Sequence, residues 1–93
     1  MPIVTARSLT QLLGNWRDGA PGPAYAGLAD RVRLLVLDGR IPLGTRIPAE
    51  RDLATSLGLS RTTVSAAYAQ LRSAGYLSSV RGSGSIEIGR AHV

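Results

Sequence analysis

The stretch IPAERDLATSLGLSRTTVSAAYAQLRSAGYL, residues 47–77, decides the fold, because it holds two helical patterns separated only by a glycine turn. The first pattern starts around Ala49, directly after Pro48, and stops at Gly58. Proline is well tolerated in the first turn of a helix, and glycine readily ends one. The buried positions expected for this short helix are Leu53, Ala54 and Leu57.

The second pattern begins at Ser60, whose hydroxyl can cap the free amides of a helix, and it ends before Gly75. Its apolar residues recur at helical spacing and are Val64, Ala67, Tyr68 and Leu71. Two helices joined by a short glycine turn indicate a helix-turn-helix.

A short helix is also expected near the N-terminus. Ser8 can cap it, and it should run to Asp18, where the connector GAPGP, residues 19–23, cannot continue a helix. Its apolar stripe consists of Leu9, Leu12, Leu13 and Trp16.

The next helix is expected from Ala24 to about Asp38, with Gly39 ending it in the left-handed conformation. Its buried face should contain Tyr25, Leu28, Val32 and Leu35. Leu34 and Leu37 lie on the opposite side and need a second cover. The candidates are the Leu/Trp stripe of the first helix, a partner subunit or a missing domain.

After the second pattern the periodicity becomes that of a β-hairpin. YLSSV, residues 76–80, and SIEI, residues 85–88, flank the turn RGSG, residues 81–84. The inward residues should be Leu77, Ile86 and Ile88. The segment 41–48, which precedes the first pattern, is expected to be an extended connector. The sequence therefore predicts a mainly α fold with a small β-hairpin: a winged helix-turn-helix, with a three-helix core plus wing and an extra N-terminal helix.

Composition restricts the chemistry of the chain. It has 93 residues, 44% of them hydrophobic and 18% charged, as expected for one small globular domain. Cysteine is absent and His92 is the only histidine, so disulfides, thiolate metal sites and metal catalysis are disfavoured. No apolar run approaches the length of a membrane span, and a cytoplasmic protein with no membrane partner is expected.

The charge balance favours an anionic partner. All eleven basic residues are arginine, against six acids, giving a formal net charge of +5. Because lysine is absent, this chain cannot form a Schiff base with pyridoxal phosphate. No carboxylate pair, catalytic triad or phosphate loop is evident, and we expect no enzyme and no cofactor in this chain.

The solvent face of the helix that starts at Ser60 is smooth. Thr62, Ala66 and Ala69 lie opposite its buried stripe, with Ser65 at the flank. Short side chains let a helix approach base edges in the major groove. Arg61 can reach guanine or a phosphate, and the hydroxyls of Thr62 and Thr63 can bond bases or backbone. The alternative is an alanine-rich surface selected for helix propensity, with Arg61 merely solvated.

Arg51 is a candidate phosphate ligand, because it lies in a first helical turn beside the free amides of Ala49 and Glu50. The alternative is a surface arginine paired with Asp52 or Glu50. Glu50 itself either orients an arginine across the turn or only complements the helix dipole.

The turn of the wing combines charge with small residues. Arg81, Gly82 and Ser83 could lie against a phosphate or in a narrow minor groove. The alternative is that the glycines only satisfy the dihedral angles of a tight turn.

These residues resemble the GntR family of bacterial transcription regulators. The family pattern, LPSEReLA...LGVSRtTVreAl..L...G followed by a glycine wing, is similar to IPAERDLATSLGLSRTTVSAAYAQLRSAGYLSSVRGSGSI. AAYAQLRSAGYLSSVRGSGS is closer still to the MocR branch, as is LLGNWRDG before GPAYAGLADRVRLLVLDGRIPLGTRIP. The resemblance implies DNA contacts by Arg51, Arg61, Thr62, Thr63 and Gly82.

Two departures from the family pattern bear on the site. Ser65 stands where many members carry arginine, and Ala49 replaces the commoner serine, which removes a helix cap. MocR-type proteins continue into an aminotransferase-like domain that binds pyridoxal phosphate and supplies dimerisation. The resemblance therefore implies that this chain is the excised or truncated DNA-binding domain of such a protein, with homodimerisation through the missing C-terminal domain.

The sequence thus predicts specific recognition of a double-stranded DNA operator. The expected division is an N-terminal helix and connector at 1–23, the winged helix-turn-helix at 24–90 and a linker or tail from 91 to 93. The alternatives are a protein-interaction module, in which Leu34, Leu37 and Trp16 form an exposed patch, and part of a cofactor enzyme. The expected DNA-binding residues are Ala49, Glu50, Arg51, Ser60, Arg61, Thr62, Thr63, Ser65, Arg81, Gly82 and Ser83.

Overall fold

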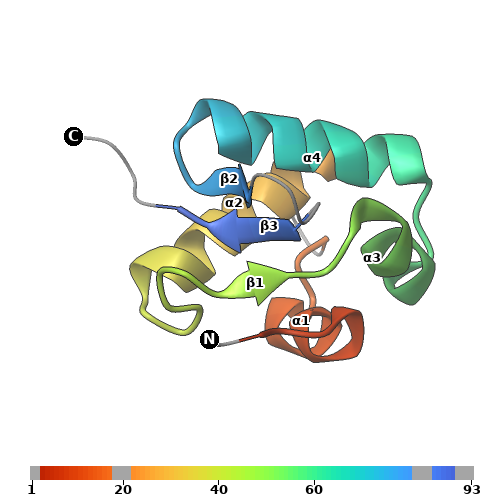
Figure 1. Ribbon diagram of the computed structural model, residues 1–93. Helices are drawn as coiled ribbons and strands as arrows, with labels where there is room; N and C mark the ends of the chain where they lie inside the picture. Colours follow the sequence, from red (N-terminus) through yellow and green to blue (C-terminus); the bar gives the residue numbers. More distant parts are fainter. Residues whose placement is uncertain (1–2, 18–21, 81–84, 90–93) are drawn as a thin grey trace.

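The computed structural model describes residues 3–17, 22–80 and 85–89 (Figure 1). The order of elements along the chain is α1 (Ala6–Leu13), α2 (Ala24–Leu37), β1 (Arg46–Ile47), α3 (Glu50–Leu57), α4 (Arg61–Ser73), β2 (Leu77–Val80) and β3 (Ser85–Ile88). The predicted mainly α fold with a small sheet is confirmed. Within the described part of the chain, no helix is long and apolar enough to cross a membrane.

The bounds predicted for the first helix were wrong. Thr5, not Ser8, caps α1: its Oγ1 accepts a hydrogen bond from the Ser8 amide at 3.1 Å. The helix ends at Leu13 because Gly14 adopts a positive φ of 57°, so Trp16 lies beyond it. The hydroxyl of a threonine three residues earlier serves the same capping role as that of a serine.

Helix α2 buries Leu28, Val32 and Leu35 as predicted, together with Ala29. Tyr25, which was expected to be buried, is exposed at the first turn of the helix. Leu34 and Leu37 are 42% and 59% exposed. Of the candidate covers, α1 does not cover these leucines, because it packs mainly against α3 at the lower edge of the molecule (Figure 1).

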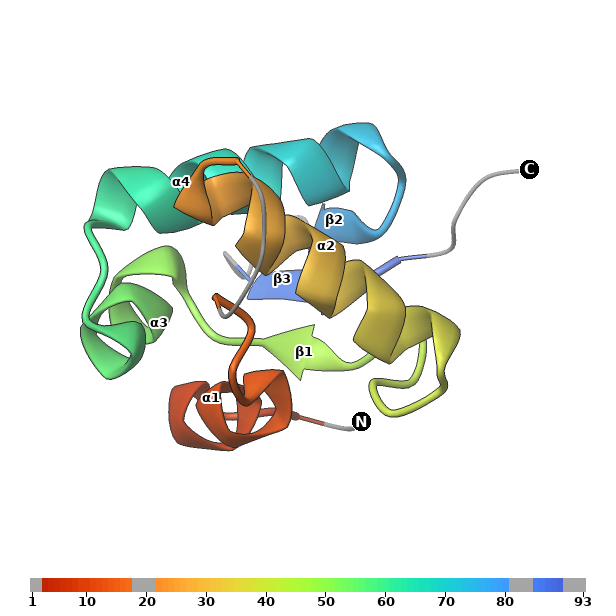
Figure 2. The ribbon, with the colours of Figure 1, turned by 180° about the vertical axis from the view of Figure 1, so that it is seen from behind.

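Helices α3 and α4 form the predicted helix-turn-helix. Gly58 ends α3 in the left-handed conformation with φ 70°, and Ser60 caps α4. Helix α4 packs against both α2 and α3, and Figure 2, the view from behind, shows α2 crossing in front of it. The predicted stripe of α4 is buried, so its opposite side faces away from the core. In α3, Leu53 and Ala54 are buried, whereas Leu57 is only partly buried.

The wing is a three-stranded antiparallel sheet in the order β1-β3-β2, not the isolated hairpin expected from the sequence. Segment 41–48 was predicted as a connector, but Arg46 and Ile47 pair with Glu87 and Ile86 of β3. Strand β1 in turn receives the N-terminal segment, through a hydrogen bond from the Val4 amide to the Arg46 carbonyl at 2.9 Å. Two residues were too few to reveal a strand by alternation.

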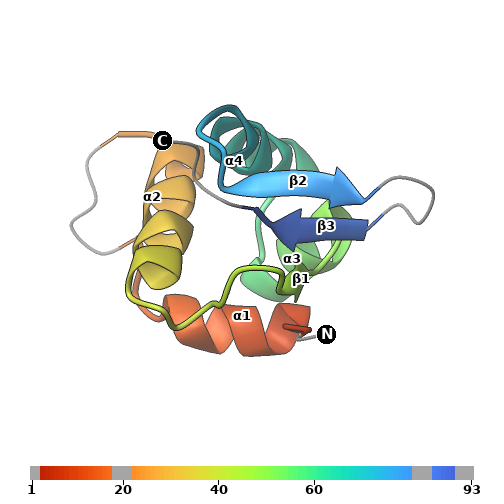
Figure 3. The ribbon, with the colours of Figure 1, turned by 60° about the vertical axis from the view of Figure 1, so that its left-hand side comes forward.

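The core lies between the helices and the inner face of the sheet (Figure 3). Leu77 and Ile88 are buried there as predicted, and Ile86 is partly buried. The largest side chains with less than 2% exposure are Tyr68, Leu9, Leu13, Leu28, Ile41, Leu53, Ile88 and Val64. The core is therefore shared by all four helices and the sheet.

The buried hydroxyl of Thr45 should lower the free energy of unfolding. Thr45 is the one buried polar residue in the described part of the chain, at 3% exposure. Its hydroxyl has no hydrogen-bond partner among the described residues. A buried unsatisfied hydroxyl costs about 1–3 kcal/mol. We expect Thr45→Val to raise the free energy of unfolding by about 1 kcal/mol, measured by urea denaturation. Thr45→Ser is the control, since it keeps the hydroxyl; a loss of stability in Thr45→Val would contradict the assignment.

Candidate nucleic-acid interface

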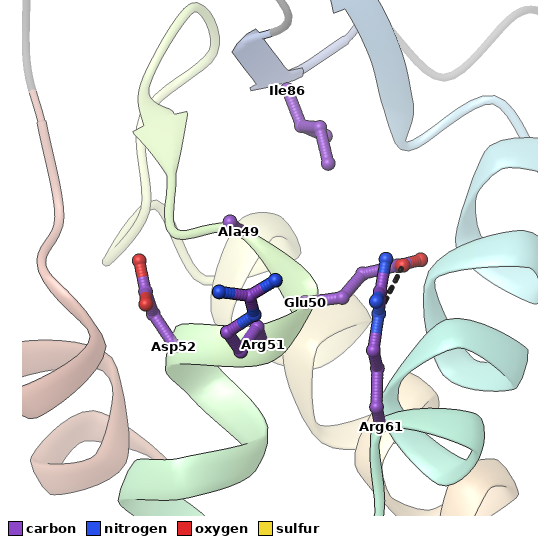
Figure 4. A pocket seen from close by; sticks show the side chains of 6 residues that line it. All are labelled: Ala49, Glu50, Arg51, Asp52, Arg61 and Ile86. Carbon is purple, nitrogen blue, oxygen red and sulfur yellow. Dashed lines mark ion pairs between the residues drawn. The ribbon is translucent and has the colours of Figure 1, made fainter.

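The first turns of α3 and α4 and strand β3 surround an open hollow of about 380 Å³. Its lining residues are Ala49, Glu50, Arg51, Asp52, Arg61 and Ile86 (Figure 4). Gly58 makes this arrangement, because its turn folds α4 back beside α3. The structure thus brings Arg51 and Arg61, ten residues apart in sequence, to one site.

Glu50 and Arg61 point toward each other across the hollow (Figure 4). The Arg61 Nε lies 4.0 Å from the Glu50 Oε1, and the Arg61 side chain is 68% exposed whereas that of Glu50 is 24% exposed. An exposed pair at this distance contributes little to stability. The pair leaves most of the Arg61 side chain accessible, with its guanidinium beside the Glu50 carboxylate.

The start of α3 offers amides as well as an arginine. The N-cap Ala49 has an extended backbone and makes no side-chain capping hydrogen bond. The positive end of the helix dipole therefore opens into the hollow beside the exposed Arg51. Glu50 and Asp52 balance the charge of this turn, so the hollow combines two arginines with two acids.

The outer side of α4 continues the same surface. Glu50 and Arg61 line a second open hollow of about 510 Å³ together with Thr62, Ser65, Ala66 and Ala69. Apart from Glu50 and Arg61, every side chain here is short and uncharged. Such a face fits the width of a major groove.

The hydroxyls of Ser60 and Thr63 contribute to helix capping. The Ser60 Oγ accepts the Thr63 amide at 3.1 Å and lies 2.9 Å from the Thr63 Oγ1. Thr63 is partly buried, whereas Thr62 is exposed. The sequence grouped the two threonines; Thr62 lines the outer side of α4, whereas the Thr63 hydroxyl lies beside the Ser60 cap.

The predicted wing residues Arg81, Gly82 and Ser83 lie outside the described residues. The strands that flank them are described, and β3 contributes Ile86 to the hollow next to Arg51 and Arg61. The Arg72 Nη2 of α4 lies 3.4 Å from the Ser79 Oγ of β2. The base of the wing is therefore attached to the same helix that presents the smooth face.

Sequence reasoning missed one contact beneath the site. The hydroxyl of Tyr68 donates a hydrogen bond of 2.7 Å to the carbonyl of Pro48, just before α3. Burial, with smaller effects of Glu50 and Asp52, raises the pKa of Tyr68 above its ordinary value, so the phenol remains a donor. The signal available was a tyrosine in an otherwise apolar stripe, because a buried hydroxyl needs a partner.

The helix-turn-helix of α3 and α4, packed with α2 and a short three-stranded sheet, defines a winged helix-turn-helix protein. The family model for the bacterial regulatory proteins of the gntR family matches residues 24–86. The chain belongs to the GntR family, and it is the DNA-binding domain of a bacterial transcription regulator.

Several curated relatives are similar to the chain. The pyridoxine biosynthesis transcriptional regulator PdxR of Corynebacterium glutamicum is 47% identical over 57 residues, covering 61% of this chain and 13% of the regulator. A putative L-lactate dehydrogenase operon regulatory protein of Escherichia coli is also 47% identical over 57 residues, covering 61% of this chain and 22% of that protein. The probable rhizopine catabolism regulatory protein MocR of Rhizobium meliloti is 40% identical over 62 residues, 67% of this chain and 13% of MocR. The chain thus spans less than a quarter of these relatives.

Solved structures share the fold. YtrA of Sulfolobus acidocaldarius, a GntR-family transcription factor, superposes with a TM-score of 0.70 and 28% identity, over 81% of this chain and 77% of YtrA. The DNA-binding domain of AraR in complex with its operator ORX1 gives a TM-score of 0.62 and 33% identity, over 72% of this chain and 81% of that domain. A close structural match is therefore known bound to operator DNA.

Proposed function

We propose that this domain reads a specific operator with α4 in the major groove, while α3 and the wing bind the flanking backbone. The observation that carries the proposal is the surface shared by Arg61 and the short side chains Thr62, Ser65 and Ala66. Bidentate contacts of arginine with guanine are the commonest specific contacts in the major groove. The similarity to the operator-bound AraR domain supports the same mode of binding.

The roles within the site follow from exposure. Arg61 contacts a base edge, with Glu50 orienting it, and Thr62 and Ser65 contact bases or nearby phosphates. Arg51 and the open amides of α3, at Ala49 and Glu50, bind phosphate and set the register of the protein on the duplex.

DNA contacts are also proposed for three residues of the wing. Arg81, Gly82 and Ser83, which follow β2 in the sequence, contact the adjacent backbone or minor groove. Ser60 acts indirectly, because its hydroxyl caps α4 and fixes the first turn.

We also propose that the protein belongs to the MocR branch and acts in the cytoplasm. The 40% identity to MocR supports the assignment. The proposed division is an N-terminal helix and connector at 1–23, followed by the winged helix-turn-helix at 24–90. In that branch, pyridoxal phosphate and homodimerisation belong to an aminotransferase-like domain. Because this chain contains no lysine, it cannot hold the cofactor as a Schiff base.

One observation favours a second role as a protein-interaction module. Leu34 and Leu37 are exposed on α2, as that interpretation requires, whereas Trp16 packs partly against the core. A partner bound there would leave the α4 face free for DNA. The two roles are therefore compatible.

The central experiment is selection of duplexes from a random pool by the 93-residue protein, followed by fluorescence anisotropy at several salt concentrations. Preference for a selected duplex over its scrambled version, maintained as salt rises, is the expected result. Equal binding to both duplexes, lost at high salt, would refute sequence recognition and leave only a basic surface.

Arg61→Ala should weaken binding to the selected duplex by about 1–3 kcal/mol and relax specificity at one base pair. Binding to the scrambled duplex should change much less, because the lost contact is to a base. Arg40→Ala is the matched control, since it removes the same charge from an exposed arginine after α2. Equal losses on both duplexes would show that Arg61 contacts only phosphate.

A further inference from the structure

Tyr68 connects the two helices that meet DNA. Its side chain is 1% exposed in the middle of α4, and its hydroxyl donates to the Pro48 carbonyl at 2.7 Å across 20 residues of sequence. Pro48 is followed by Ala49, the N-cap of α3, and then by Glu50 and Arg51. The hydrogen bond therefore ends on the residue directly before Ala49, the first residue of the candidate site.

The opposite end of α3 is fixed by the chain itself. Gly58 and the short turn join the C-terminus of α3 to the start of α4. The N-terminus of α3 is about 12 Å away, at 1.5 Å per residue. A small rotation about the turn would move Arg51 relative to Arg61. The Tyr68 hydrogen bond, at the far end of α3, resists that rotation.

Packing at this position does not need the hydroxyl. Phenylalanine would fill the same volume between α4 and the start of α3, whereas a buried phenol requires a partner. The Pro48 carbonyl is that partner. It takes no part in the backbone hydrogen bonds of α3, the first of which runs from the Leu53 amide to the Ala49 carbonyl at 3.1 Å. The hydrogen bond therefore adds a directional contact to an interface that is otherwise apolar.

We propose that Tyr68 is a positioning residue for operator recognition: its hydrogen bond holds the start of α3, with Glu50 and Arg51, in register with Arg61 on α4. This inference rests on the proposed function. It predicts that the hydroxyl contributes to specificity without touching DNA.

The test is Tyr68→Phe, titrated against the selected and scrambled duplexes at a temperature where circular dichroism shows all variants folded. We expect about three- to tenfold weaker binding to the selected duplex and little change on the scrambled one. Tyr25→Phe is the matched control, because it removes the same hydroxyl from an exposed tyrosine. Unchanged binding by Tyr68→Phe, or a variant that does not fold at any temperature, would overturn the positioning role.

A double-mutant cycle separates positioning from a general loss of stability. In an Arg61→Ala background, Tyr68→Phe should lose most of its effect on binding to the selected duplex, because that effect passes through the placement of Glu50 beside Arg61. Additive losses would overturn the proposal. The wild-type titration separates the two proposals. No preference of the wild type for the selected duplex refutes the proposed function itself, whereas a preference as large in Tyr68→Phe as in the wild type refutes only this inference.

Discussion

Ala66→Glu is expected to weaken DNA binding by at least about 100-fold while the domain stays folded, because like charges placed across an interface cost several kcal/mol. Ala66 lies on the outer side of α4 between Thr62 and Ala69, where the remaining side chains are short. A glutamate there would add length and negative charge to the helix that faces the phosphates. Anisotropy titration with the selected duplex measures the loss, and circular dichroism checks the helix content.

The control for this variant is Leu37→Glu, which changes the net charge by the same amount. Leu37 is 59% exposed on α2, and α2 packs on α4 from the core side, away from the proposed DNA face. We expect Leu37→Glu to bind DNA almost as well as the wild type. If Ala66→Glu bound equally well, the outer face of α4 would not be the DNA surface, and the exposed leucines of α2 would become the principal interaction site.

The helix-turn-helix was predictable because its signals are local. Pro48, Gly58 and Ser60 act within a few residues of themselves, and the stripe of α4 follows from spacing alone. The same holds for Arg51 and Arg61, which lie in first turns. Their mutual placement follows from Gly58, so most of the candidate site could be derived before the fold was known.

The contacts that the sequence did not reveal are those between distant segments. Strand β1 is two residues long and is defined only by its pairing with β3, whose Ile86 also enters the site. The hydrogen bond from Tyr68 to the Pro48 carbonyl needs the packing of α4 on α3. The tyrosine in an apolar stripe signals that a partner is needed, but not which residue supplies it. Tyr25 is an error in the opposite direction. Its spacing fits the buried stripe of α2, but it lies in the first turn of the helix, beyond the core, and is exposed.

Whether helix α1 belongs to the domain is a further question, because it lies outside residues 24–86, which match the family model. Nevertheless Leu9 and Leu13 are 1% and 0% exposed. The Thr10 Oγ1 also lies 2.7 Å from the Ser56 Oγ on α3. The helix is therefore packed into the domain and supports α3 from the side away from α4 (Figure 1).

Leu13→Ala should consequently lower the free energy of unfolding by about 2–5 kcal/mol, through lost burial and the cavity left behind. That is a large part of the roughly 5–15 kcal/mol that stabilises an ordinary domain. Urea denaturation followed by circular dichroism measures the change, with Leu37→Ala as the exposed control expected to stay within about 0.5 kcal/mol. Equal, small effects of the two substitutions would mean that α1 is only an appendage. A large effect confined to Leu13 would make the N-terminal helix part of the DNA-binding unit, because α3 carries Arg51 and loses its support when α1 is loosened.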